Sequence, residues 1–288
     1  MRDLNYQLKQ LCRRNRDGSY ETRMNRERLL SLMADQLHRF GFRHMGAASL
    51  KGKHVEALVE HWLSEKIAIG TIKNRMSVLR WWAEKSGRPH VVARENEFYG
   101  IPDRRFVTGV SKAKEIDQAK LDQIRDTHVR MSLELQRAFG LRREEAIKFQ
   151  PSYADRGDHL LLKPSWTKGG KERQIPIHTA AQREILARAH RVAGRGSLIP
   201  SARNYRQQLR VYERHTANAG LSKLHGLRHA YAQARYEALT GWKAPAAGGP
   251  SAASLTADQR AIDREARAVV SQELGHERER ITVVYLGR

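Results

Sequence analysis

The sequence predicts a mainly α-helical protein of two domains, with one small antiparallel β-sheet in the second domain. Apolar residues recur with helical spacing in residues 22–86 and again from residue 117 onward. Residues 88–115 lie between these stretches and contain prolines and glycines among charged side chains, as in a linker. Apolar, strand-like runs at 159–163 and 174–177 flank a Gly-rich turn and predict a hairpin. With 40% hydrophobic residues, the chain has enough apolar surface to bury a core.

The first part of the chain predicts a helical DNA-binding unit. Residues 1–20 are basic and polar, and we interpret them as an N-terminal arm, either solvated or lying on a DNA backbone. Residues 21–100 form the predicted helical domain. In this domain, apolar side chains repeat every three or four positions at 29–37, 55–63 and 72–83, which predicts three amphipathic helices.

The second part predicts the α+β domain, at residues 117–288, after a linker at residues 101–116. Its expected helices cover residues 121–139, a short helix starting at 143, 181–192, 204–219, 225–236 and 256–274. Gly140 ends the first of these, and Thr256 with Gln259 forms a capping box at the start of the last. Residues 241–257 contain a Pro/Gly/Ala-rich stretch and are interpreted as an insertion.

Composition indicates nucleic acid as the partner. The formal net charge is +22, spread along the whole chain, and a polyanion would relieve the resulting self-repulsion. A single cysteine, Cys12, rules out an internal disulfide framework and fits a reducing cytosol. The N-terminus has no signal-peptide pattern, no window approaches a membrane span, and Walker A, GxGxxG and HExxH patterns are absent. A cytoplasmic, nucleoid-associated protein with no membrane contact is expected.

Six side chains in five short contexts suit phosphoryl transfer by a tyrosine nucleophile. They are Arg142, Lys168, His225, Arg228, His276 and Tyr285. Arginine presents a planar, permanently charged fork of donors that matches the oxygens of a phosphodiester. Tyrosine has a pKa near 10, so only about one phenol in a thousand is ionised at pH 7, and a neighbouring base has to assist it. Each residue alone is a weak signal, and their combination in a strongly basic chain points to DNA strand exchange.

The motifs resemble those of the tyrosine recombinase (phage integrase) family. Gly140-Leu141-Arg142 with Glu145 resembles the first arginine box, and the segment from Thr167 to Ile177 resembles the β-hairpin that bears the family's lysine. His225-Gly226-Leu227-Arg228-His229 resembles the second box. Leu274-Gly275-His276, followed nine residues later by Tyr285, resembles the last. The resemblance covers residues 120–288, whereas the N-terminal unit resembles the core-binding domain only in size and helical pattern.

The resemblance implies roles for these residues. Arg142 and Arg228 would clamp the scissile phosphate, His225 would act as the base, and His276 would hydrogen-bond the phosphate. Lys168 would protonate the leaving 5′ oxygen, although the residues alone do not decide between Lys168 and Lys171 in the same turn. Glu145 would orient the cluster from behind. A covalent 3′-phosphotyrosine would store the bond energy, so neither ATP, a metal ion nor another cofactor is expected.

The implied partner is double-stranded DNA at specific recombination sites, bound by a homotetramer, with accessory DNA-bending or directionality proteins as further candidates. Eight residues are predicted to contact DNA, although a solvated surface is the alternative for each. They are Lys66, Lys73, Asn74, Arg75, Arg80, Arg104, Arg105 and Lys171.

Two features depart from the family pattern. One is the insertion at 241–257. The other is that the chain ends three residues after Tyr285, where many members continue with a segment that docks on a neighbouring subunit. That segment is absent, is missing from a truncated chain, or is replaced by another form of communication. The expected function is integration or excision of a mobile element. A chromosome-dimer resolvase, a type IB topoisomerase and a catalytically inactive architectural or regulatory DNA-binding protein are the alternatives.

Overall fold

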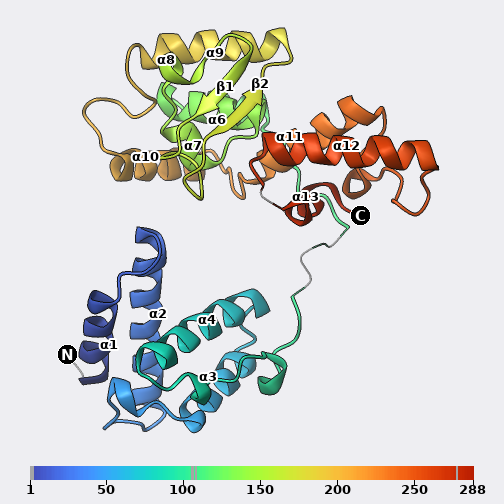
Figure 1. Cartoon of the computed structure of the whole chain (residues 1–288). Coiled ribbons are helices and arrows are strands. Elements are labelled where there is room, and N and C mark those ends of the chain that lie inside the picture. The colour runs from blue at the N-terminus through green and yellow to red at the C-terminus, as the bar shows by residue number, and fades with distance from the viewer. Residues whose placement is uncertain (1–2, 105–106, 108, 277) are drawn as a thin grey trace. The chain divides into compact units, whose positions relative to one another are not determined.

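A computed structural model describes residues 3–104, 107, 109–276 and 278–288, which fall into two compact units (Figure 1). The first unit is Met1–Arg105 and the second is Phe106–Arg288. The first is helical, and the second combines helices with one antiparallel pair of strands. This confirms the predicted fold class. No helix among the described residues is both long enough and apolar enough to cross a membrane.

Helices α2 (Tyr20–Arg39), α3 (Gly52–Ser64) and α4 (Ile69–Lys85) build the first unit. Their apolar faces meet in one core, in which Leu37, Trp62, Met76 and Trp82 are fully buried. The three helices correspond to the three stretches of helical periodicity in the sequence. The short helix η1 (Ala47–Ser49) lies in the connection between α2 and α3.

The predicted N-terminal arm is instead largely helical. Residues Asp3–Arg14 form helix α1, which packs on α2 and buries Leu4 and Leu8 in the core of the first unit. Two leucines four positions apart lie on one face of a helix, and the many basic residues around them concealed this pattern. Burial of this face makes α1 part of the helical unit.

The segment between the two units is anchored at both ends. Short helices η2 (Pro89–Val91) and η3 (Glu97–Tyr99) follow α4, and Ile101 is buried in the first core. Ile116, at the other end, is buried in a core of the second unit. Residues 101 and 116, the bounds of the predicted linker, therefore both pack into folded units.

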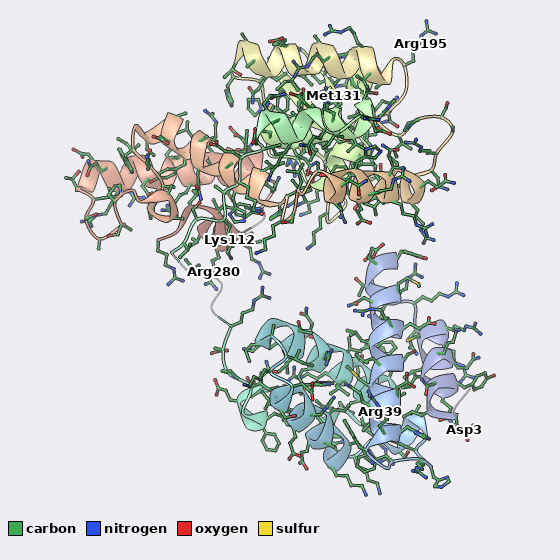
Figure 2. All side chains as sticks on the ribbon, turned by 180° about the vertical axis from the view of Figure 1, so that it is seen from behind. Asp3, Arg39, Lys112, Met131, Arg195 and Arg280 are labelled. Atoms are coloured by element: carbon green, nitrogen blue, oxygen red, sulfur yellow. The ribbon has the colours of Figure 1, made fainter. Side chains whose placement is uncertain are left out.

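In the first half of the second unit, α6 (Thr127–Phe139) lies between α9 (Ala180–Ala193) and α10 (Tyr205–Asn218) (Figure 1). The smaller elements are α5 (Gln118–Asp122), α7 (Arg143–Ile147), α8 (Pro151–Ala154), β1 (His159–Leu162) and β2 (Arg173–Pro176). The two strands pair antiparallel, with Leu160 opposite Ile175. Met131 lies inside this half and Arg195 projects from its edge (Figure 2).

The second half packs α11 (Gly226–Thr240), α12 (Ala257–Glu273) and α13 (Glu279–Leu286) around their own apolar cluster. The predicted capping box of Thr256 and Gln259 is present at the start of α12. The segment 241–257 contains the short helix η4 (Pro245–Ala247), which packs against α13, and buries Ala244 and Leu255. Helix α13, which bears Tyr285, was not predicted from the sequence.

Candidate active site

A cleft of about 890 Å³ in the second unit is lined by Arg142, Lys168, His225, His276 and Tyr285. These are five of the six residues predicted to do chemistry. They come from the start of α7, the hairpin turn, the residue before α11, the turn after α12, and α13. The sixth, Arg228, is 1% exposed and lies behind the cleft wall.

The turn between α6 and α7 sets the position of Arg142. Gly140 ends α6 with a left-handed backbone (φ 60°), and a side chain there would meet the ring of Tyr231 at 2.5 Å. Glycine is therefore required at this position. Two residues later Arg142 is the N-cap of α7, and its backbone N–H donates to Oε2 of Glu145 at 2.7 Å. The local fold thus places the guanidinium at the mouth of the cleft, with its side chain 23% exposed.

Arg142, Arg173 and Arg228 form an arginine cluster at the site. Among the described residues, Glu145 is the only carboxylate in hydrogen-bond contact with this cluster. It is 1% exposed and accepts from Nη1 of Arg142 at 2.8 Å. Arg173 donates to both of its oxygens, at 3.0 and 2.7 Å. Burial would raise the pKa of Glu145, but the charge and hydrogen bonds of Arg173, with the charges of Arg228 and Arg142, lower it to about 2.

Sequence reasoning missed Arg173. It is the first residue of β2 and only 6% exposed, and it lies in the predicted hairpin segment, where the sequence assigned it no role. An arginine at a buried, inward-facing strand position is a signal, since charged side chains are rarely buried without a partner. Alternation along β2, which places Arg173 and Ile175 on the buried face, could have identified it.

Three guanidinium groups converge on the carbonyl oxygen of Leu274, at the end of α12. Arg228 and Arg173 donate to it, the latter at 3.3 Å, and Nη2 of Arg142 lies at 3.5 Å. Arg228 also donates to the carbonyl of Gly140, and its Nε is buried with no hydrogen-bond partner. Burial and repulsion from Arg142 and Arg173 lower the pKa of Arg228 to about 10, so it stays charged at neutral pH. With one carboxylate against three arginines, the cluster favours an anion.

The hydroxyl of Tyr285 is in hydrogen-bond contact with Nε2 of His225, at 3.0 Å. His229 stacks on the phenol ring with centroids 4.3 Å apart, and His276 lies on it at 5.1 Å. The ring is 6% exposed, and the guanidinium of Arg228 lies 5.9 Å from its centroid. The nucleophile candidate therefore touches a base and lies among imidazoles and a cation.

The histidines around Tyr285 are held neutral. Burial, followed by the positive charges of Arg228 and Arg142, lowers the pKa of His225 and brings that of His276 to about 3. Burial and His225 lower the pKa of His229 to about 4. A neutral imidazole accepts a proton, so at pH 7 His225 is in the form that a general base requires. Nδ1 of His276 is in hydrogen-bond contact with Oγ1 of Thr282, which orients the ring.

Lys168 and Lys171 both line the cleft from the turn between β1 and β2. Oγ1 of Thr167 donates to the carbonyl of Lys171 at 2.5 Å and closes this turn. The turn places both lysines beside the cleft, and the choice between them stays open. No group of three or more His, Cys, Asp or Glu residues suited to a metal ion occurs in the described part of the chain.

Two family models match most of the chain. The model "Phage integrase, N-terminal" matches residues 1–92, and the model "Integrase" matches residues 104–234. The chain belongs to the phage integrase family of tyrosine recombinases. This places it in a class of DNA-binding site-specific recombinases. No curated protein matches it by sequence.

Solved structures of tyrosine recombinases share the fold of this integrase-family chain. A lambda integrase dimer bound to a COC′ core site matches with a TM-score of 0.64 and 18% identity, over 99% of this chain and 78% of that one. A lambda integrase tetramer bound to a Holliday junction matches with a TM-score of 0.58 and 15% identity, over 95% of this chain and 77% of that one. The Tn1549 transposon integrase in complex with circular intermediate DNA matches with a TM-score of 0.55 and 14% identity, over 100% of this chain and 96% of that one.

The residues of the first unit that were predicted to contact DNA differ in their contacts within the protein. Lys73 pairs with Asp103 at 2.7 Å, and Arg80 donates to the Ala93 carbonyl and to Asn96. Arg75 lies over the ring of Trp62 at 5.1 Å. Its Nε and Nη1 are buried without a hydrogen-bond partner.

The remaining predicted contacts are more exposed or lie outside the described part. Lys66 and Asn74 are exposed, and Lys66 has a left-handed backbone just after α3. Arg104 packs over Gly70, while Arg105 lies outside the described residues. Lys73 and Arg80 have hydrogen-bonded partners, whereas two nitrogens of Arg75 are buried without one, so geometry separates Arg75 from these two residues.

Proposed function

We propose that this protein cleaves and rejoins DNA strands at specific sites through a covalent 3′-phosphotyrosine, during integration or excision of a mobile element. The contact between Tyr285 Oη and His225 Nε2, at 3.0 Å, is the main support. It lies in the same cleft as Arg142, which together with Arg173 pairs with the buried Glu145 carboxylate. A nucleophile, a base and an excess of cationic donors are what attack on a phosphodiester requires.

In the proposed first step, the Tyr285 oxygen attacks the scissile phosphorus while His225 accepts the phenolic proton. The new Tyr–O–P bond forms as the bond from phosphorus to the 5′ oxygen breaks. Arg142, at the cleft mouth, would donate to the non-bridging oxygens, and the buried charge of Arg228 would stabilise them from behind. Loss of one such donor typically costs about 3 to 4 kcal/mol in the transition state.

Departure of the 5′ oxygen needs a proton, and Lys168 is the proposed donor. It lines the cleft from the hairpin turn, as does Lys171, which is the alternative. His276 would hydrogen-bond the phosphate, since its neutral ring lies beside the Tyr285 ring. The reverse sequence, with a 5′ hydroxyl attacking the phosphotyrosine, rejoins the strand without ATP because the ester retains the bond energy.

The proposed partner is double-stranded DNA bound by a homotetramer. Strand exchange between two duplexes requires four cleavage events, and one fold relative is a tetramer on a Holliday junction. The net charge of +22 favours DNA association and, with it, a nucleoid location. Accessory DNA-bending or directionality proteins belong to the same proposal. The Tn1549 relative, a transposon integrase, supports the mobile-element context.

In the first unit we propose that Arg75 contacts a DNA phosphate and that Arg80 is structural. The half-buried Arg75 guanidinium lies over the Trp62 ring with Nε and Nη1 buried, which leaves Nη2 to reach a phosphate, whereas the Arg80 guanidinium donates to Ala93 and Asn96. Arg75→Ala is expected to lower the slope of log affinity against log salt by about 1. Arg80→Ala is the matched control and should leave that slope unchanged while lowering the unfolding temperature. The reverse result would contradict the assignment.

Covalent trapping tests the central proposal. The protein is mixed with DNA spanning the junctions of its host element, nicked near the presumed cut, in EDTA, and run on a denaturing gel beside Tyr285→Phe. An adduct that is absent from the Tyr285→Phe lane is the expected result, and the labelled strand maps the cut. Tight binding with no adduct on any junction would favour the alternative, a DNA-binding protein of this fold without catalysis.

A further inference from the structure

Helix α13 has only eight residues, Glu279–Leu286, too few to be stable by itself in water. The position of Tyr285 must therefore be imposed by what surrounds the helix. Its inward side is buried, with Leu286 and Thr282 at 0% exposure, but apolar contact alone permits sliding and rotation. Directional contacts at the end of the helix are needed to fix the phenol within reach of His225.

Two side chains hold the carbonyl groups at the C-terminal end of α13. Nε2 of Gln233, on α11, donates to the Tyr285 carbonyl at 2.9 Å. Nη1 of Arg267, on α12, donates to the Gly287 carbonyl at 2.9 Å. The last carbonyls of a helix have no partner within the helix, so these two donors act as side-chain caps.

Arg267 is itself locked in a buried polar chain. Its Nε donates to both oxygens of Asp263, at 2.8 and 2.9 Å, and both residues are 7% exposed. The hydroxyl of Tyr236 donates to Asp263 at 2.5 Å and accepts from Nε1 of Trp242 at 3.2 Å. Trp242 belongs to the segment 241–257, so this segment is connected to the cap of the nucleophile helix.

The same segment also touches the end of α13 directly. Gly287 has a left-handed φ of 81°, and a side chain there would meet the backbone nitrogen of Ala246 at 2.7 Å. The backbone of η4 therefore closes over Gly287. Gln233, Arg267, Asp263, Tyr236, Trp242 and Ala246 together form what we call the α13 socket.

We propose that the α13 socket, with Arg267 at its centre, is a positioning device that holds Tyr285 in line with the phosphate site. This inference rests on the proposed function. Arg267 binds the carbonyl of Gly287, which lies two residues after the nucleophile Tyr285 in the chain. Arg267 itself does not touch the reacting atoms. The segment 241–257 thereby gains a role, since it closes the socket through Trp242 and Ala246.

The experiment separates positioning of Tyr285 from the rest of the site by using two reactions. Covalent cleavage of nicked junction DNA needs Tyr285. Joining of a strand that ends in a 3′-(4-nitrophenyl) phosphate does not, because a 5′ hydroxyl attacks the phosphorus and 4-nitrophenolate leaves. Both rates are measured at saturating DNA on the full chain, with Tyr285→Phe as the variant that should join but not cleave.

Arg267→Gln is expected to slow cleavage about 10²-fold, the loss typical of a misplacement near 1 Å, while joining stays within about twofold of wild type. Arg267→Lys keeps one donor and should recover part of the cleavage rate. Gly287→Ala disturbs the socket from the other side, because its Cβ would meet the backbone nitrogen of Ala246 at 2.7 Å, and should slow cleavage alone; its unfolding midpoint is measured beside that of wild type.

Equal loss of cleavage and joining in Arg267→Gln and Gly287→Ala would mean a merely structural role and would overturn the inference. Cleavage at the wild-type rate in both variants would also overturn it. If wild-type protein neither cleaves nor joins, the proposed function fails and the inference fails with it, whereas wild-type cleavage unaffected by the variants refutes the socket alone.

Discussion

Replacing Glu145 with glutamine is the sharpest test of how the arginine cluster is held together. The change preserves shape but removes the one carboxylate that pairs with Arg142 and Arg173. The amide nitrogen would also face a guanidinium, so a donor would meet a donor. The cluster would then hold three buried or half-buried arginines with no compensating charge.

The magnitude follows from two independent arguments. A pKa of about 2 for Glu145 against an ordinary 4.5 corresponds to about 3 kcal/mol of stabilisation of its charged form. Removing one partner of a buried ion pair costs about 3 to 5 kcal/mol. A destabilisation of about 3 kcal/mol should lower the midpoint of the second unit by about 6 to 12 °C.

The pH dependence gives the assay its internal control. The folded pKa of Glu145 is depressed, so its contribution is fully present above pH 4.5 and is lost as the pH falls toward 2. Urea unfolding of the second unit is monitored by hydrogen exchange in its peptides. The difference in free energy of unfolding between wild type and Glu145→Gln should be complete at pH 7 and smaller at pH 3. A gap below about 0.5 kcal/mol at pH 7, within the range of ordinary surface substitutions, would refute the reasoning.

Two further predictions concern the backbone and the histidines of the site. Gly140→Ala should destabilise the second unit by about 2 kcal/mol more than Gly157→Ala, because both have left-handed backbones but only Gly140 faces the Tyr231 ring; equal midpoints in thermal unfolding would contradict this. His229 and His276, with folded pKa values of about 4 and 3, bind fewer protons than the unfolded chain below pH 6.5. Stability is therefore not reduced by these two histidines above pH 6.5. About 2 kcal/mol of the free energy of unfolding should be lost between pH 7 and 5 after allowance for solvent screening, as urea unfolding at both pH values would measure.

The sequence predicted those parts of the site that depend on local motifs. Gly140 ends α6 because only glycine fits there, which brings Arg142 to the start of α7. The helix after His225 places Arg228 one turn further on, on the same face. The order of these short boxes along the chain was sufficient to expect a common site, and the cleft does bring five of the six side chains together.

What the sequence left open depends on partners that lie far apart in the chain. A lysine or arginine on a helix looks the same whether it faces DNA or a neighbouring group, and only the fold shows that Lys73 meets Asp103. Helix α13 was missed since a helix of eight residues has little intrinsic signal, and tertiary contacts decide whether it forms.

The same reasoning explains why the sequence predicts only an insertion at 241–257. Its composition of Pro, Gly and Ala indicates a loop, and nothing local marks Trp242 as a donor to Tyr236. A buried network of hydrogen bonds fixes a structure only when every group in it has a partner. Here the network ends on the carbonyl of Gly287, beside the nucleophile. Residues that bear chemistry can thus be found from short motifs, whereas residues that aim them have to be found from packing.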